Sequence, residues 1–252
     1  MIPTGLQALL WGTLAGGALV LGCAIAWKWQ IRQKTVSTIM SFGAGVLISA
    51  LAFELVDEAA ATGGLRPTAY GFLAGAVVFV AANWLLATKG ARHRKRSGSQ
   101  QPSEGEDPGS GTAIAIGALL DGVPESLVLG LGLVGTGAVS PAMLVAIFIS
   151  NVPEGLSSTA GMKKAGRSAG YVFGVWTAIA VLSGVAALIG YAALQDAPAN
   201  QIAFINALAA GAILAMIADT MIPEAFEEHH LLTGLTAAVG FVTAFAIHDA
   251  GG

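Results

Sequence analysis

The chain has 252 residues, of which 55% are hydrophobic and only 11% carry a charge. An ordinary soluble domain is about 25% charged, so this composition excludes a soluble globular protein. Cys23 is the single cysteine, which excludes an intramolecular disulfide and a thiolate metal cluster within one chain. The net charge of −3 says little, but the apolar composition predicts a single polytopic membrane domain over residues 1–252.

Apolar runs long enough to cross a bilayer recur along the whole chain. The hydrocarbon core of a bilayer is about 30 Å thick and needs about 20 apolar residues of helix. The runs predict eight transmembrane helices, named here spans one to eight, and the fold class is an all-α integral membrane protein. They cover residues 5–27, 36–56, 68–88, 112–134, 141–161, 169–194, 201–222 and 232–248.

Basic residues fall almost entirely in alternate connections. Of the 12 Lys and Arg residues, 11 follow spans one, three and five. Positively charged loops stay in the cytoplasm, so we expect these connections to be cytoplasmic and both termini to be extracytoplasmic, in the cell membrane. The run Arg92–Arg96 is expected to lie at anionic lipid headgroups, and no nucleic-acid partner is expected.

Residues 89–111 connect span three to span four. The second part of this connection, 97–111, is rich in Ser, Gly, Glu and Pro and cannot bury a core. We therefore expect a flexible cytoplasmic loop, with three helices before it and five after it.

Spans two and seven share a short pattern. Thirteen positions separate Gly45 from Glu58 in span two and Gly211 from Glu224 in span seven, and an alanine follows each glutamate. The two spans are expected to run in opposite directions. The match therefore predicts an inverted repeat, relating spans one to three to spans six to eight around the central pair of spans four and five. Convergent helix composition is the alternative.

Spans four and five carry related motifs near their middles, DGVPESL at 121–127 and SNVPEGL at 150–156. The shared core is Val-Pro-Glu-x-Leu. Each proline removes a backbone N–H and leaves a carbonyl without its usual donor, and such an oxygen can bind a cation. Because the two helices are antiparallel, the two motifs can face each other.

The motifs place three carboxylates inside the membrane. Asp121 and Glu125 lie four residues apart on one helical face, Ser150 and Glu154 repeat that spacing, and Asn151 lies beside them. A mid-bilayer carboxylate costs about 2.5–3.5 kcal/mol and marks a functional site. The middles of the two spans contain no Lys, Arg or His, so a bound cation supplies the counter-charge most simply. The alternative is protonated or hydrogen-bonded carboxylates that join helices.

We therefore predict a metal site formed by Asp121, Glu125, Asn151 and Glu154, with Ser150 assisting. Its ligands are all oxygen, which favours Mg, Ca or Mn over Zn, because Zn usually takes nitrogen or sulfur as well.

At these residues the sequence resembles the ZIP (Zrt/Irt-like) family of metal-ion transporters, whose fourth and fifth helices carry related Pro-centred motifs. The stretches AGVLISALAFELVDEA and AAGAILAMIADTMIPEA, the eight spans and the loop after span three extend the resemblance over essentially the whole chain. It implies a divalent metal-cation transporter for Zn, Fe, Mn or Cd that moves metal into the cytoplasm. It further implies a transporter that is not an enzyme, has no prosthetic group and forms a homodimer.

The resemblance also implies that spans one, four, five and six move as a unit against the other four. Several positions depart from the family. Asp121 stands where the family usually has His, Gly122 where it has Asn, Ser150 where many members have another His, and Ser126 where it has Gly. Span six has no Glu at 183–187, which favours a single metal over a binuclear centre. The ligands carried over by the resemblance are Asp121, Gly122, Glu125, Ser150, Asn151 and Glu154.

Charged groups at the ends of spans two and seven are the expected entrance and exit of the ion, with ordinary solvated helix ends as the alternative. His248, at the end of span eight, is expected to be a polar interfacial residue. The entrance and exit groups are Glu54, Asp57, Glu58, Asp219, Glu224, His229 and His230.

Three other functions remain open from the sequence. They are a metal sensor or non-transporting relative, an intramembrane metal-dependent hydrolase, and a proton-coupled carrier of a small organic cation.

Overall fold

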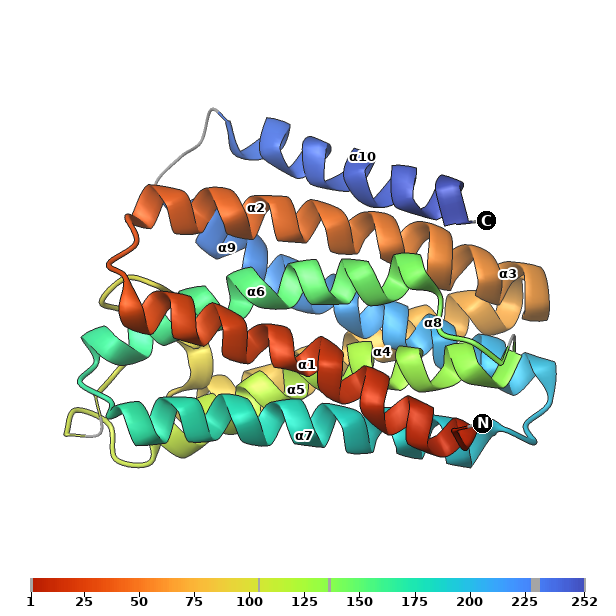
Figure 1. Ribbon diagram of the computed structural model, residues 1–252, viewed down its shortest axis with the longest axis horizontal. Helices are drawn as coiled ribbons and strands as arrows, with labels where there is room; N and C mark the ends of the chain where they lie inside the picture. Colours follow the sequence, from red (N-terminus) through yellow and green to blue (C-terminus); the bar gives the residue numbers. More distant parts are fainter. Residues whose placement is uncertain (1, 104, 136, 228–231, 252) are drawn as a thin grey trace.

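The computed structural model describes residues 2–103, 105–135, 137–227 and 232–251. Long helices run side by side along one direction, and these ranges contain no strand (Figure 1). The predicted helical runs are confirmed within three residues at each boundary, except that span two continues seven residues further, to Gly63. Six of them are α1 (Thr4–Lys28), α4 (Leu65–Ala87), α5 (Ser110–Gly135), α6 (Pro141–Lys164), α7 (Ala169–Leu194) and α10 (Thr233–Gly251).

The predicted spans two and seven each contain a π-helical segment. α2 (Gln33–Ala50) continues through η1 (Leu51–Val56) into α3 (Asp57–Gly63), and α8 (Ala199–Met216) continues through η3 (Ile217–Met221) into α9 (Ile222–Ala225). η1 carries Glu54 and η3 carries Asp219. Such wider turns occur frequently at functional sites.

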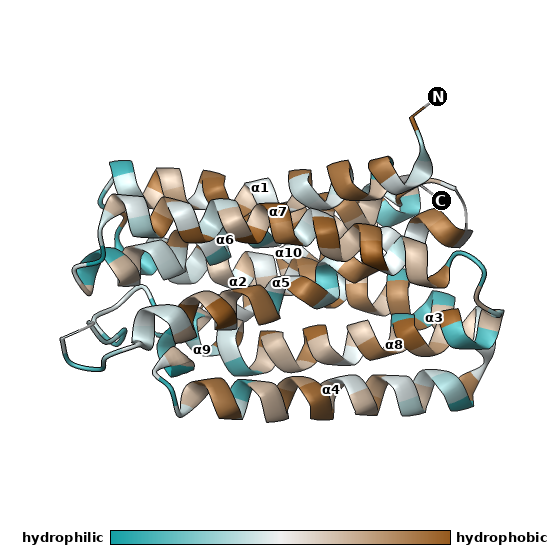
Figure 2. Cartoon of the chain, turned by 90° about the horizontal axis from the view of Figure 1, so that it is seen from below, coloured by the Kyte–Doolittle hydropathy of each residue, from teal (hydrophilic) through white to brown (hydrophobic). Residues whose placement is uncertain are grey.

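By length and composition, seven helices within the described residues are able to cross a membrane. The long helix outside this set is α6, which has 24 residues and a more polar middle that includes Asn151 and Glu154. Hydrophilic residues gather at the two ends of the bundle, whereas hydrophobic residues cover its length (Figure 2). The chain therefore has the architecture of a multi-pass membrane protein.

The helices pack in two groups. In the first, α1 packs against α6 and α7, and α5 against α7; in the second, α2 packs against α10, and α4 against α8. Glycines allow these close approaches, since a Cβ on Gly45 would lie 1.9 Å from the carbonyl oxygen of Ala237. The largest buried apolar cluster joins the two groups, with Leu47 from α2, Ile147 from α6 and Met216 from α8.

Both described ends of the chain lie at the same end of the bundle (Figure 1). The opposite end carries the connections 29–32, 88–109 and 165–168, and with them most of the basic residues, so we call it the basic end. The connection 88–109 includes the 3₁₀ turn η2 (Ala91–His93).

The connection 88–109 does not simply cross the basic end. Arg94, Lys95, Ser97 and Gln101 are buried, so this part of the predicted flexible loop packs into the bundle. The expectation that the whole basic run lies at lipid headgroups is therefore wrong for Arg94 and Lys95. Arg94 and Lys95 are buried because they pair with buried carboxylates.

Candidate functional site

α5 and α6 bury the three predicted carboxylates near their middles. Asp121 and Glu125 of α5 are 1% and 2% exposed, and Glu154 of α6 is 5% exposed. Glu125 lies within electrostatic range of both Glu154 and Asp121. Pro124 and Pro153 lie inside continuous helices, so the motifs keep their carboxylates on regular helical faces. The sequence thus correctly predicted buried carboxylates on the two adjacent spans.

The counter-charge comes from the connection between α4 and α5. Arg94 binds Asp121 through two parallel hydrogen bonds, Nε to Oδ2 at 2.8 Å and Nη2 to Oδ1 at 2.7 Å. Lys95 Nζ lies 2.7 Å from Glu154 Oε2 and 3.4 Å from Asp121 Oδ2. A buried carboxylate requires such a partner. Neither cation lies within a predicted span, so the sequence did not predict them as partners of the carboxylates.

Arg94 is held from both helix groups. Besides Asp121 of α5, its Nη1 donates to Asn83 Oδ1 of α4 at 2.7 Å. Burial by itself lowers the pKa of the Arg94 guanidinium, but the charge and hydrogen bonds of Asp121, together with the charges of Glu154 and Asp219, outweigh burial and raise that pKa above its usual value. Arg94 therefore stays charged, and its pair with Asp121 is a charge-assisted, bidentate contact.

The other two predicted ligands bond to backbone oxygens. Asn151 Nδ2 donates to the carbonyl of Ala15 in α1 at 3.0 Å, and Ser150 Oγ donates to the carbonyl of Ile147 at 2.9 Å. Two carboxylate oxygens can still accept a hydrogen bond or bind a cation, because Glu125 Oε1 and Glu154 Oε1 are buried without a hydrogen-bond partner. Such buried, unpaired acceptors cost about 1–3 kcal/mol each and would gain from a cation.

Within the described part of the chain, no group of three or more His, Cys, Asp or Glu side chains is arranged to hold a metal ion. Asp121 and Glu154 instead share Lys95 between them. The carboxylates are therefore gathered, but in this conformation they pair with cations of the chain itself.

Two of the predicted entrance residues line a small cavity at the end of the bundle opposite the basic end. The cavity measures about 30 Å³, and Glu54, Glu58, Ser140 and Asn206 are among its lining residues. Asn206 is 5% exposed, and its Oδ1 has no hydrogen-bond partner. Glu54 Oε1 lies 2.5 Å from His248 Nδ1, so His248 is a partner of the predicted entrance rather than a separate polar end. This space is sufficient for about one water molecule.

The remaining predicted groups that the structure describes are not among the lining residues of that cavity. Asp57 is exposed. At the basic end, Asp219 accepts a hydrogen bond from Asn83 Nδ2 at 3.1 Å. Glu224 is fully buried and accepts from the backbone N–H of Ser97 at 3.1 Å. The predicted His229 and His230 lie outside the described residues.

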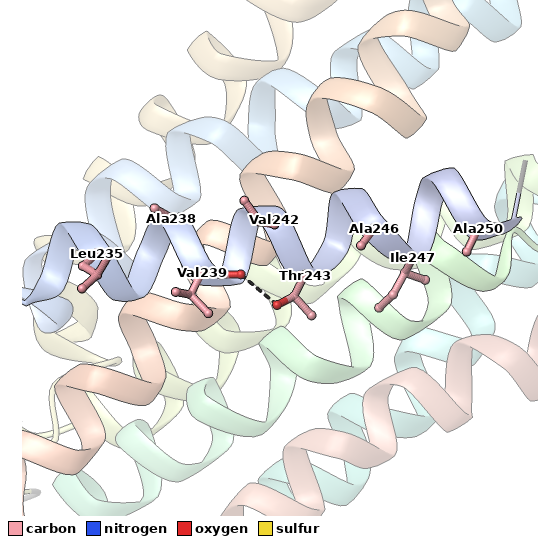
Figure 3. A pocket seen from close by; sticks show the side chains of 8 residues that line it. All are labelled: Leu235, Ala238, Val239, Val242, Thr243, Ala246, Ile247 and Ala250. Atoms are coloured by element: carbon pink, nitrogen blue, oxygen red, sulfur yellow. Dashed lines mark hydrogen bonds between the residues drawn. The ribbon is translucent and has the colours of Figure 1, made fainter.

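A wide hollow on the surface does not belong to this site. It measures about 890 Å³, and all eight of its lining residues come from α10 (Figure 3). The hydroxyl of Thr243 in this hollow donates to the carbonyl of Val239 in the same helix at 2.8 Å. The hollow is apolar, as a helix face in contact with lipid would be.

No model of a known protein family matches the chain, and no curated protein sequence matches it.

Proposed function

We propose that this protein is a divalent metal-cation transporter of the ZIP type, which moves metal into the cytoplasm through a site built from Asp121, Glu125, Asn151 and Glu154, with Ser150 assisting. The observation that carries the proposal is the burial of three carboxylates on two adjacent helices of a membrane-type bundle. Ionisable groups at such positions are typical of ion pathways.

The ligand chemistry supports a cation as the transported species. Glu125 Oε1 and Glu154 Oε1 are buried acceptors without a hydrogen-bond partner, so a cation between them would satisfy both. An oxygen-only set favours Mn²⁺ or Mg²⁺, whereas the resemblance favours Zn²⁺ or Fe²⁺. The metal is cargo in this proposal, and no prosthetic group is needed.

We also infer eight spans, including α6, and an inverted repeat. Two observations support the repeat. Each π-helical segment begins six residues after the matched glycine, η1 after Gly45 and η3 after Gly211. The contact of α2 with α10 also has its counterpart in the contact of α8 with α4. Repeats of this kind are common in transporters whose site lies between two moving units.

The orientation follows from the basic end. Its concentration of Lys and Arg favours a cytoplasmic location, with both termini outside the cell membrane. The homodimer implied by the resemblance stays a prediction.

Uptake into proteoliposomes tests the proposal. Zn²⁺, Fe²⁺, Mn²⁺ and Cd²⁺ would be supplied separately to the wild type and to the double variant Glu125→Gln plus Glu154→Gln. We expect the double variant to lose at least about tenfold in uptake rate, because it lacks two of the charged ligands. The control Asp196→Asn changes an exposed carboxylate between α7 and α8 and should transport like the wild type. Undiminished uptake by the double variant would contradict the proposal.

One observation favours a second candidate, a non-transporting relative. Arg94 and Lys95 already neutralise part of the carboxylate charge, so the cluster is able to serve as a structural ion-pair network. Metal binding by the wild type without uptake would support a sensor, and neither binding nor uptake would support the structural role.

A further inference from the structure

The carboxylate cluster holds two positive charges that are covalently part of the chain. Arg94 pairs with Asp121, and Lys95 lies between Asp121 and Glu154. Both cations come from the same short segment, residues 94–101, which follows η2 and precedes α5. Long cationic side chains of a polar loop ordinarily remain in water, so their burial here needs a reason.

The two charges together equal the charge of one divalent ion. Three carboxylates with Arg94 and Lys95 carry a formal charge of −3 + 2 = −1, and the same carboxylates with one divalent cation carry −3 + 2 = −1. Exchange of one for the other therefore leaves the buried charge unchanged. Departure of the segment without a replacement cation would leave −3 in a low-dielectric site, which is unfavourable.

Two glycines provide space for the segment. A Cβ on Gly117 of α5 would lie 2.6 Å from Arg94 Cδ, and a Cβ on Gly161 of α6 would lie 2.0 Å from the carbonyl oxygen of Arg96. Real Cβ atoms do not approach other atoms so closely. Both helix surfaces are therefore shaped to receive the segment.

Polar bonds to α6 complete the binding surface. Ser157 Oγ donates to the carbonyl of Lys95 at 2.5 Å. Gln101 Nε2 lies within hydrogen-bond distance of the carbonyls of Arg94, Arg96 and Ser158, at 2.9, 3.0 and 3.0 Å. These contacts hold the backbone of the segment directly beside the carboxylate cluster.

The segment also reaches the second helix group. Ser97 donates to Glu224 of α9 from its backbone N–H and its hydroxyl, and Arg96 Nη1 lies 2.6 Å from Glu227 Oε2. It thus connects α5 and α6 to the end of the α8–η3–α9 helix. A cavity of about 240 Å³ lies beside it, lined by residues that include Lys95, Asp219 and Thr220. Lys95, which pairs with Asp121 and Glu154, therefore borders open space at the basic end.

We propose that residues 94–101 form a tethered cationic plug, which occupies the carboxylate site in place of a divalent cation and must leave before the metal binds. The inference rests on the proposed function, since it concerns the same site. The plug also contacts both helix groups, so its release would remove one set of polar contacts between them.

Metal binding to the full-length protein in detergent tests the plug, with Mn²⁺ and Zn²⁺ as probes. Two variants weaken the plug in different ways. Lys95→Gln removes a competing charge, and Gly161→Ala displaces the backbone of the segment without changing a carboxylate. If only a fraction of the molecules have the plug released, the apparent affinity for metal is the intrinsic affinity multiplied by that fraction. We therefore expect both variants to bind at least about tenfold more tightly than the wild type.

The matched control is Gly174→Ala in α7, where a Cβ would meet nothing within 4 Å. It should bind metal like the wild type. Amide hydrogen exchange of residues 94–101 provides an independent measurement, and we expect saturating Mn²⁺ or Zn²⁺ to accelerate it in the wild type. Unchanged affinity in both variants, or exchange that metal does not accelerate, would overturn the plug.

The outcomes separate the plug from the proposed function. If the wild type takes up metal but both variants match its affinity, the plug fails and transport stands. If the variants bind more tightly and metal releases the segment, but no protein transports metal, the plug stands and transport fails. Absence of binding by every protein would overturn the plug.

Discussion

Buried negative charge is partly offset by nearby cations in the carboxylate cluster. Arg94 and Lys95 offset Asp121 and Glu154, whereas no ion pair or hydrogen bond satisfies Glu125 Oε1. Removal of one partner from a buried ion pair usually costs about 3–5 kcal/mol, because the other charge is left without compensation. Loss of Arg94 or Lys95 from the cluster without a replacement cation is therefore unfavourable.

His93 links the stability of the plug region to pH. Burial lowers the pKa of His93, the charges of Arg92 and Arg96 lower it further, and Glu227 opposes them. The folded-state pKa is thus below the unfolded value of about 6.5, so the folded state takes up a proton less readily. This contribution to stability is fully present above about pH 6.5 and is lost as the pH falls through the unfolded pKa toward the folded pKa.

We therefore expect the thermal midpoint of the wild type to fall between about pH 7 and pH 5 more than that of His93→Gln. The measurement is a thermal unfolding series in detergent at each pH. The variant keeps a polar side chain of similar length but cannot be protonated. Parallel pH dependences for the two proteins would show that His93 does not contribute.

The sequence predicted the intramembrane carboxylates but not the cations that pair with them, for a physical reason. A carboxylate in an apolar run such as 112–134 is visible because it is costly there. Arg94 and Lys95 lie in a basic loop, and such a loop has the same composition whether it is solvated or folded back. The fit of Gly117 and Gly161 to the segment depends on tertiary contacts, which one sequence does not reveal.

Helix boundaries were predictable at the scale of elements, because charges and turn residues end the apolar runs near the ends of α1, α5 and α7. The π-helical segments η1 and η3 were not predictable from the sequence, because one extra residue in a turn does not change the composition of a span. The packing role of most glycines was also hidden. Gly75 and Gly17 look alike in the sequence, but only Gly75 touches another helix.

That difference gives a prediction for the pair α4 and α8. A Cβ on Gly75 would lie 1.8 Å from the carbonyl oxygen of Leu208, so Gly75→Ala must separate the two helices. We expect the free energy of unfolding to fall by about 1–3 kcal/mol, which is measured as a lower thermal midpoint of unfolding in detergent.

The control is Gly17→Ala in α1, where a Cβ would meet nothing within 4 Å. It should be neutral or slightly stabilising, because alanine favours a helix by about 1 kcal/mol over glycine. Equal midpoints for the two variants would mean that the close contact between α4 and α8 does not limit stability.

The whole molecule is asymmetric between its two ends. Residues 94–101 fill the basic end and bind both helix groups, whereas the small cavity beside Glu54, Glu58 and Asn206 lies at the opposite end. The direction of the proposed transport and the action of the proposed plug therefore both depend on which end faces the cytoplasm.

Labelling of intact cells decides the orientation. Cys23 is buried, and in a Cys23→Ser background the variants Ser99→Cys and Asp196→Cys place a thiol on exposed positions at opposite ends. Because basic connections remain in the cytoplasm, we expect a membrane-impermeant maleimide to label position 196 in intact cells and position 99 only after permeabilisation. The reverse pattern would place the plug outside the cell, where it would control entrance of the metal instead of its release into the cytoplasm.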